Sequence, residues 1–190
     1  MSSVETFDGA EEVRRAWMAS LAPDPSLTVS QWADRHRVLS SRAASEAGPY
    51  RTARTPYMKA VMDALSPRNP AQRVVFIKAA QVGATEAGNN WIGFCMHRAP
   101  GPFLAVQPTV DLAKRLSQQG IDPLIEESPD LRALVPPSRS RDAGNTVVGK
   151  RFPGGQLILT GANSAVGLRS MPARWVVLDE GDAYLPGRPR

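Results

Sequence analysis

Three residues within eight positions of the chain could together hold a phosphate group. Lys78 carries a positive charge, Gly83 can adopt backbone angles closed to other residues, and Thr85 offers a hydroxyl group to Mg²⁺. Their spacing follows the phosphate-binding pattern G-x-x-x-x-G-K-[ST], but Lys78 replaces the first glycine and Ala84 replaces the lysine. An ordinary turn between a strand and a helix is the alternative. The loop amides that we expect to face the phosphate belong to Gln81, Val82, Gly83 and Ala84.

A second group of chemically useful residues follows about ninety positions later. Residues 174–178 form an apolar stretch that ends in the adjacent carboxylates Asp179 and Glu180, which is the pattern of a Walker B strand. Asp179 would hold Mg²⁺ through water, and Glu180 would polarise the water that attacks the terminal phosphate of a nucleotide. A solvated acidic turn is the alternative. Both half-motifs in this order predict an ATP-binding, Mg²⁺-dependent ATPase.

The elements that must position these residues alternate between strand and helix. The sequence predicts a buried strand over Val74 to Ile77, a helix from Ala84 to about His97, and a strand over residues 103–106. A hairpin follows, with arms over residues 146–148 and 156–160, before the Walker B strand. This alternation predicts an α/β fold with a parallel sheet and right-handed crossovers.

Helical signals also precede the phosphate loop. Residues Glu11 to Leu21 place Val13, Trp17 and Leu21 on one helix face, and Thr28 is positioned to cap a short helix. Thr55 and Pro56 predict the start of another helix. We expect an N-terminal helical arm and linker over residues 1–48 and a partial ATPase domain over residues 49–190.

Three stretches of this chain resemble the N-terminal ATPase domain of the large terminase subunit of tailed bacteriophages, in its lambda-type group. They are KAAQVGATE, FLAVQPTVDLAKRLS and GGQLILTGANSAVGLRSMPARWVVLDEGDAY, and the resemblance extends from about Ser30 to Tyr184. Members of this group commonly carry the lysine at the start of the loop, where Lys78 lies. The resemblance implies a three-layer P-loop NTPase fold with an extra strand between Walker A and Walker B (the ASCE, or terminase, type), here incomplete at its C-terminus.

The family also implies an activity and partners. Its members use ATP to move double-stranded DNA into a procapsid, with a small terminase subunit, a portal protein and homo-oligomerisation of the full-length subunit. The C-terminal nuclease domain of the family is not encoded in these 190 residues. The expected location is the cytoplasm of an infected or lysogenic bacterial host. The alternatives are an inactive, truncated prophage remnant that at most binds nucleotide or DNA, and a helicase-like ATPase.

Several other residues have candidate roles. Tyr50 and Arg51 precede the phosphate loop and could stack on adenine, whereas Tyr57 is expected to pack its helix onto the sheet. Arg169 could act as an arginine finger or contact DNA, with an ion pair to Asp179 or Asp182 as the alternative. Lys114 and Arg115 could touch DNA or face water. His97 has no second metal ligand nearby in the sequence, so no metal site is predicted there.

Composition sets broader limits. The chain is 42% hydrophobic, and no stretch approaches the ~20 apolar residues needed to span a membrane. Its single cysteine, Cys95, lies on the apolar face of a predicted helix and is expected to be a buried thiol. From Arg132 onward, nine basic residues stand against four acidic ones, which accounts for the formal net charge of +5. Such an excess suits a partner rich in phosphate, although the charges are scattered and a generally solvated surface is the alternative.

Overall fold

In the part of the chain that the structure describes, the main sheet holds four strands, and three of them are parallel. A computed structural model describes residues 9–21, 26–41, 46–135, 145–164, 168–169 and 171–184. Strands β3 (Phe103–Gln107), β5 (Gly155–Gly161) and β6 (Trp175–Leu178) run parallel, and β4 (Gly149–Phe152) joins β5 as an antiparallel edge in the order β4-β5-β3-β6. A separate antiparallel pair is formed by β1 (Val38–Leu39) and β2 (Gly48–Pro49), which are two residues long. The predicted α/β class with a mostly parallel sheet is confirmed.

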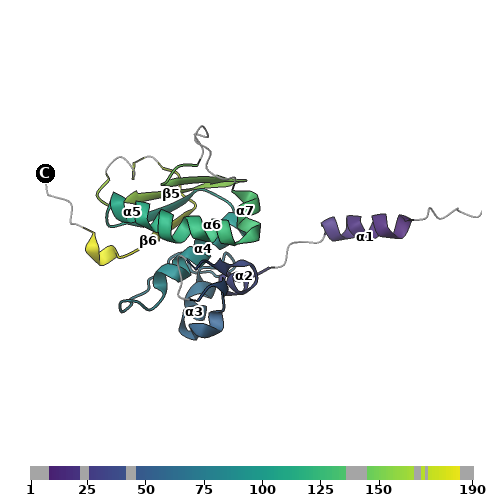
Figure 1. The fold of residues 1–190 in the computed structure, drawn as a ribbon, viewed down its shortest axis with the longest axis horizontal. Helices are drawn as coiled ribbons and strands as arrows, with labels where there is room; N and C mark the ends of the chain where they lie inside the picture. The colour runs from purple at the N-terminus through teal and green to yellow at the C-terminus, as the bar shows by residue number, and fades with distance from the viewer. Residues whose placement is uncertain are drawn as a thin grey trace, which may run out of the picture.

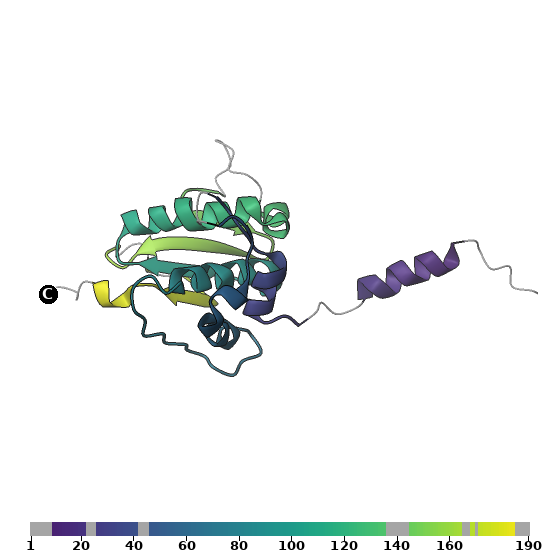
Figure 2. The same cartoon turned by 60° about the horizontal axis from the view of Figure 1, so that its bottom comes forward.

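The helices separate these strands along the chain (Figures 1 and 2). They are α1 (Ala10–Leu21), α2 (Val29–His36), α3 (Pro56–Ala64), α4 (Ala84–Arg98), α5 (Val110–Leu116), α6 (Asp122–Glu127) and α7 (Pro129–Leu134), with short turns at η1 (Thr52–Arg54) and η3 (Gly181–Ala183). A π-helical segment, η2 (Ser117–Ile121), connects α5 to α6. The predicted helices over residues 11–21 and 84–97 are confirmed within one residue at each end.

Local signals explain where these helices begin. Thr28 caps α2 with a complete capping box, in which its side chain and that of Gln31 each accept a backbone N–H. Pro56 occupies the first turn of α3, where its missing N–H costs nothing. Thr55 precedes it as predicted but makes no side-chain capping hydrogen bond.

The hydrophobic core lies between the helices and one face of the sheet. Phe103, Ala105, Leu157 and Leu159 alternate with residues on the other face and share one buried cluster with α2 to α7. Trp91 of α4 packs edge-on against Phe103, with ring centroids 4.9 Å apart. Cys95 is 1% exposed in this core, which confirms the predicted buried thiol, and burial raises its pKa well above the usual range.

The opposite face of the sheet does not share that core. Its apolar residues follow from the strand registers and are Leu104, Val106, Ile158, Val176 and Leu178. On the edge strand β6, Val176 is 46% and Leu178 is 61% exposed. Among the residues described, the helices therefore gather on one face, and the second helical layer of the predicted three-layer arrangement is not among them.

The strand predicted over Val74–Ile77 is absent from the sheet. This segment has no regular secondary structure, and Val75 and Ile77 are 77% and 95% exposed. A strand needs a hydrogen-bonding neighbour, and β6 pairs only with β3 in the described sheet. The prediction of a buried strand was wrong because apolar, β-branched composition specifies a strand only where such a neighbour is present.

The predicted hairpin is present, but its first arm lies a few residues later than expected, in β4 (Gly149–Phe152). Gly154 takes a positive φ of 79°, so the tight turn is Pro153-Gly154 and the antiparallel arms begin directly beside it. Lys150, Arg151 and Phe152, which we expected in the connection, lie in strand β4.

Helix α1 stands apart from the rest of the described chain (Figure 1), with Val13, Trp17 and Leu21 each at least 64% exposed. Helix α2, in contrast, buries Trp32 completely against Phe94 of α4. We therefore propose that the boundary between arm and domain lies between α1 and α2. Among the described residues, no helix has the length and apolar character required to cross a bilayer.

Candidate nucleotide site

The N-terminus of α4 and the C-terminal end of β6 bring two predicted site residues together. Thr85 Oγ1 donates a hydrogen bond of 3.2 Å to Asp179 Oδ2, across 94 positions of sequence. Gln107 Nε2 at the end of β3 donates to the same oxygen at 3.4 Å, and the backbone N–H of Glu180 donates to Asp179 Oδ1 at 3.0 Å. Asp179 is thus held in place from three directions.

The loop before α4 has the backbone geometry expected of a tight turn. Gly83 caps the helix with φ of 82°, and Gln81 also takes a positive φ of 57°. A Cβ at Gly83 would meet nothing within 4 Å, so the backbone angle is what favours glycine there. Tyr57 Oη donates to the carbonyl of Val82 at 3.3 Å, which ties the loop to α3.

Between these elements lies an open pocket of about 250 Å³. Its walls include the α4 residues Thr85, Glu86 and Asn89 and the acidic pair Asp179 and Glu180. The opposite wall consists of Gln107 and a stripe of α5 and η2 residues that comprises Leu112, Arg115, Leu116, Gln119 and Gly120.

The oxygen ligands at one end of this pocket fit Mg²⁺. Magnesium prefers hard oxygen donors, and two neighbouring ligands of an octahedral ion lie about 3 Å apart. The 3.2 Å separation of Thr85 Oγ1 and Asp179 Oδ2 lets one ion contact both atoms.

The other predicted site residues are more dispersed. Lys78 is exposed on the extended segment, and Lys78, Gln81, Val82, Gly83 and Ala84 are not among the residues that line the pocket. Arg169 is exposed and is also absent from that lining. The structure therefore brings together Thr85, Asp179 and Glu180, while Lys78 and Arg169 are not part of the pocket wall.

Tyr50 and Arg51 lie in different environments. Tyr50 is only 8% exposed, and the guanidinium of Arg37 lies 5.6 Å from the centre of its ring. Such burial leaves little of the ring for an adenine base and weighs against the predicted stacking. Arg51 is exposed. The side chain of Tyr57, expected to pack inward, is 58% exposed and instead bonds the loop.

Three contacts of this site escaped the sequence reasoning. Gln107 reaches Asp179, Arg115 lines the pocket, and Tyr184 Oη donates to the carbonyl of Val106 at 2.9 Å. Burial, together with the negative charge of Asp179, raises the pKa of Tyr184 to about 12, so its hydroxyl remains a donor at neutral pH. The signal for Gln107 was its place directly after a buried strand, where parallel sheets gather their functional loops.

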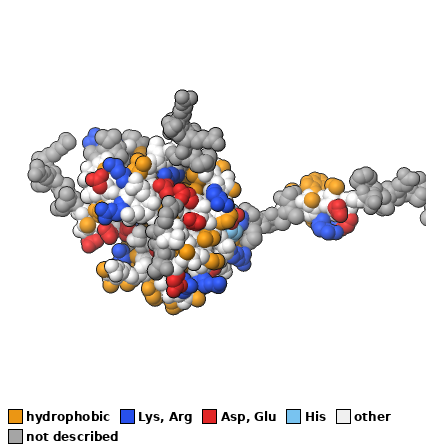
Figure 3. All heavy atoms as spheres, in the orientation of Figure 1, with side chains coloured by type: hydrophobic (Ala, Val, Ile, Leu, Met, Phe, Trp, Pro, Cys, Tyr) orange, Lys and Arg blue, Asp and Glu red, His pale blue; other side chains and the backbone are white. Residues whose placement is uncertain are grey.

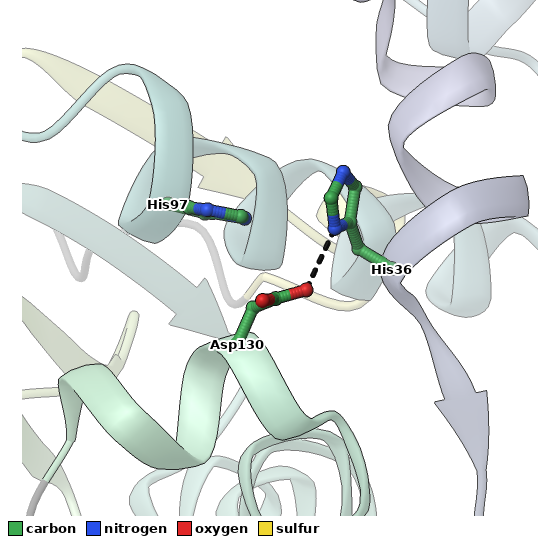
Figure 4. Close-up of side chains that lie close together, drawn as sticks. All are labelled: His36, His97 and Asp130. Carbon is green, nitrogen blue, oxygen red and sulfur yellow. Dashed lines mark hydrogen bonds and ion pairs between the residues drawn. The ribbon is translucent and has the colours of Figure 1, made fainter. Parts of the chain in front are cut away.

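His97 has two groups of metal-ligating type near it in space, although neither lies near it in the sequence. His36, His97 and Asp130 place one ligand atom each within 4.8 Å of one another (Figure 4). His36 Nδ1 and Asp130 Oδ2 are 2.7 Å apart, and Trp32 Nε1 donates to His97 Nδ1 at 3.0 Å.

This hydrogen bond favours a structural role for the cluster. Indole N–H only donates, so His97 Nδ1 must accept, and a neutral imidazole then carries its proton on the other nitrogen. Binding a metal through His97 would require breaking the bond to the fully buried Trp32. We interpret the cluster as a polar connection among α2, α4 and α7.

Fold and pocket together describe an α/β ATPase-type domain. A model of the family "Phage terminase large subunit gpA, ATPase domain" matches residues 44–188, and the chain belongs to this family.

Two curated relatives agree with that assignment. The chain is 28% identical over 143 residues to the large terminase subunit of Escherichia phage lambda, covering 75% of this chain and 22% of that protein. It is 25% identical over 148 residues to the large terminase subunit of Enterobacteria phage P21, covering 78% and 22% respectively. The chain thus spans 22% of the length of these relatives. No solved structure matches it at a significant level.

Proposed function

We propose that this domain binds ATP with Mg²⁺, cleaves the bond between its β and γ phosphates, and thereby drives double-stranded DNA into a procapsid. Thr85 and Asp179 hold the metal ion, and Glu180 orients and activates water. Lys78 and the amides of residues 81–84 bind the phosphates. The single observation that carries this proposal is the 3.2 Å contact between Thr85 Oγ1 and Asp179 Oδ2 at the pocket.

The proposed roles of the metal and the base differ, so two substitutions separate them. Asp179→Asn should weaken Mg²⁺-dependent ATP binding, because an amide is a poor magnesium ligand. Glu180→Gln should bind Mg²⁺-ATP like the parent and reduce hydrolysis to zero, because it keeps the shape and loses the base. Titration calorimetry and phosphate release measure the two effects. Equal loss of binding in both variants would identify a structural acidic turn instead.

The family's packaging role implies further partners for the full-length subunit. These are a small terminase subunit, a portal protein and copies of the subunit itself, in the cytoplasm of an infected or lysogenic bacterium. Arg51 and Arg169 are exposed and remain candidates for contacts with the base and with DNA or phosphate. Among the described residues on the face shown in Figure 3, Lys and Arg side chains mix with Asp and Glu and form no continuous basic patch.

A second candidate function is nucleotide or DNA binding without turnover, as in a prophage remnant. Two observations favour it: residues 74–77 lie outside the sheet, and Lys78 is not among the pocket-lining residues. This alternative would be supported if the parent protein bound nucleotide with the same affinity as the Glu180→Gln variant. The parent would also have to release no phosphate in the presence of double-stranded DNA.

A further inference from the structure

Among the described residues, one arginine, Arg115, lines the pocket together with the proposed metal and water-activating residues. Leu112, Arg115, Leu116 and Gln119 lie at spacings of three and four residues, so they form one face of the α5–η2 helix, and all four line the pocket. Ala113 and Ser117 on the neighbouring face are fully buried. This packing fixes the rotation of the helix and directs the Arg115 stripe toward Thr85 and Asp179.

The π-helical segment contributes to this arrangement. Segments of π-helix inside α-helices are frequent at functional sites. Here η2 begins two residues after Arg115 and brings Gly120 against α4, where an added Cβ would lie 3.1 Å from Asn89 Nδ2. This close contact joins the α4 wall of the pocket to the wall that carries Arg115, because Asn89 and Gly120 both line the pocket.

Among the residues that the structure describes, some charged side chains of the pocket have partners within the protein and others do not. Glu86 pairs with Arg37, and Asp179 accepts from Thr85 and Gln107. Arg115 lines the same pocket as these carboxylates and Glu180, yet within the described part of the chain it forms no ion pair. Its neighbour Lys114 is bonded to Asp111 at 3.2 Å and does not line the pocket.

We propose that Arg115 contacts the terminal phosphate of a nucleoside triphosphate whose Mg²⁺ is held by Thr85 and Asp179. This inference rests on the proposed function. A guanidinium presents two parallel N–H donors to phosphate oxygens and cannot be deprotonated. Placed on the wall opposite the start of α4, Arg115 acts within its own chain, in the role that the sequence suggested for Arg169.

The test compares a triphosphate with a diphosphate. Titration calorimetry with Mg²⁺ uses ATP, a non-hydrolysable ATP analogue and ADP on the parent, Arg115→Ala, Arg115→Lys and the adjacent control Lys114→Ala. Arg115→Ala should lose about tenfold or more in affinity for both triphosphates, as expected for a charged hydrogen bond, and keep its ADP affinity within about twofold. Arg115→Lys should recover part of the loss, and Lys114→Ala should match the parent.

The outcomes separate this inference from the proposed function. A parent that binds nucleotide, with Arg115→Ala unchanged or weakened equally for ATP and ADP, overturns the role of Arg115 alone. A parent that binds no nucleotide overturns both. Melting curves recorded beside the titrations show whether each variant is folded. We expect all of them to fold, because Arg115 and Lys114 are exposed.

Discussion

In the proposed function, phosphate binding depends on where one positive charge lies in the loop. Position 84 holds alanine, so Lys78 is the sole cation between positions 78 and 85. Lys78 is exposed at the end of an extended segment, so its ammonium group is accessible to a phosphate.

Lys78→Ala should therefore lower ATP affinity about 10- to 100-fold, the range of a lost charge-assisted hydrogen bond. Fluorescence titration with a labelled ATP analogue measures this, and Arg73→Ala, an exposed cation in the same segment, is the matched control. Parent-like binding by Lys78→Ala would show that the loop assignment is wrong.

A site residue could be predicted from the sequence where its role follows from its neighbours in the chain, and could not where its position depends on tertiary packing. Asp179 and Glu180 were recognisable because they directly follow an apolar strand, and the structure places them beside Thr85 at the pocket. Arg115 was not recognisable, because its position depends on how α5 is rotated against the sheet. Tyr50 was placed near a base by its position in sequence, whereas its burial under Arg37 is a tertiary effect.

At the scale of elements, an ion pair between the buried Arg37 and the partly exposed Glu86 connects the end of α2 to the start of α4. The Arg37 side chain is 3% exposed and bonds Glu86 and Asn90, and its Nε has no hydrogen-bond partner among the described residues. Burial lowers the pKa of Arg37, and the negative charge of Glu86 opposes this shift. Removing one member of such a pair leaves the other charge without its partner.

Arg37→Ala should destabilise the protein by about 1 to 3 kcal/mol, because it leaves the oxygen of the buried Asn90 side chain without its hydrogen-bond donor. Urea unfolding followed by circular dichroism measures the free energy of unfolding. Arg35→Ala, at an exposed position on the same helix, should change it by less than about 0.5 kcal/mol. A loss of under 1 kcal/mol for Arg37→Ala would contradict a structural role for this pair.

Helices α2 and α3 are joined by a carboxylate whose protonation should be visible in stability. Asp63 Oδ1 accepts from Ser30 Oγ at 2.6 Å, and Lys59 Nζ lies 2.8 Å from Oδ2. Burial acts to raise the pKa of Asp63, but the hydrogen bonds from Lys59, Ser30 and Thr28 outweigh it and lower the pKa below 3.8.

A depressed pKa means that the stabilising contribution is present above pH 3.8 and is lost as the pH falls through the folded-state value. In Asp63→Asn, the free energy of unfolding should consequently depend less on pH below about 4. Denaturant titrations at several acid pH values test this, with the exposed Asp111→Asn as control. An unchanged acid slope would mean that Asp63 does not contribute.

The elements themselves were predictable where their determinants are close in sequence. Thr28 and Pro56 marked helix starts correctly, and alternation of strands and helices gave the parallel sheet. The strand over residues 74–77 failed, because pairing requires a distant neighbour that sequence composition does not reveal. The same limit applies to the second face of the sheet, which is exposed at Val176 and Leu178, since alternating burial shows that a face is apolar and does not show what covers it.

At the scale of the whole molecule, an unpaired strand edge and an apolar sheet face favour association. Strand β6 pairs on one side only in the described sheet, and Val176, Leu178 and Ile77 are exposed. We expect the 190-residue chain to associate with rising concentration and to show ATP turnover near background.

Sedimentation velocity over a range of concentrations measures this association. Val176→Lys should reduce it, because a charge at a strand edge opposes pairing with another chain. Val147→Lys, at a residue with nearly the same exposure outside the sheet edge, should not. A monomer at every concentration, with a cooperative melt and strong DNA-stimulated hydrolysis, would show that the chain is a self-sufficient motor domain.

The proposed function rests on Thr85 and Asp179 sharing one Mg²⁺ at the nucleotide, and a double-mutant cycle measures this directly. ATP affinity is titrated with and without Mg²⁺ for the parent, Thr85→Val, Asp179→Asn and the double variant. If both residues hold the same ion, each single substitution should remove most of the Mg²⁺-dependent affinity, and the double variant should lose little more than the weaker-binding single variant. Losses that simply add, or an ATP affinity that does not respond to Mg²⁺ in the parent, would contradict a shared metal site.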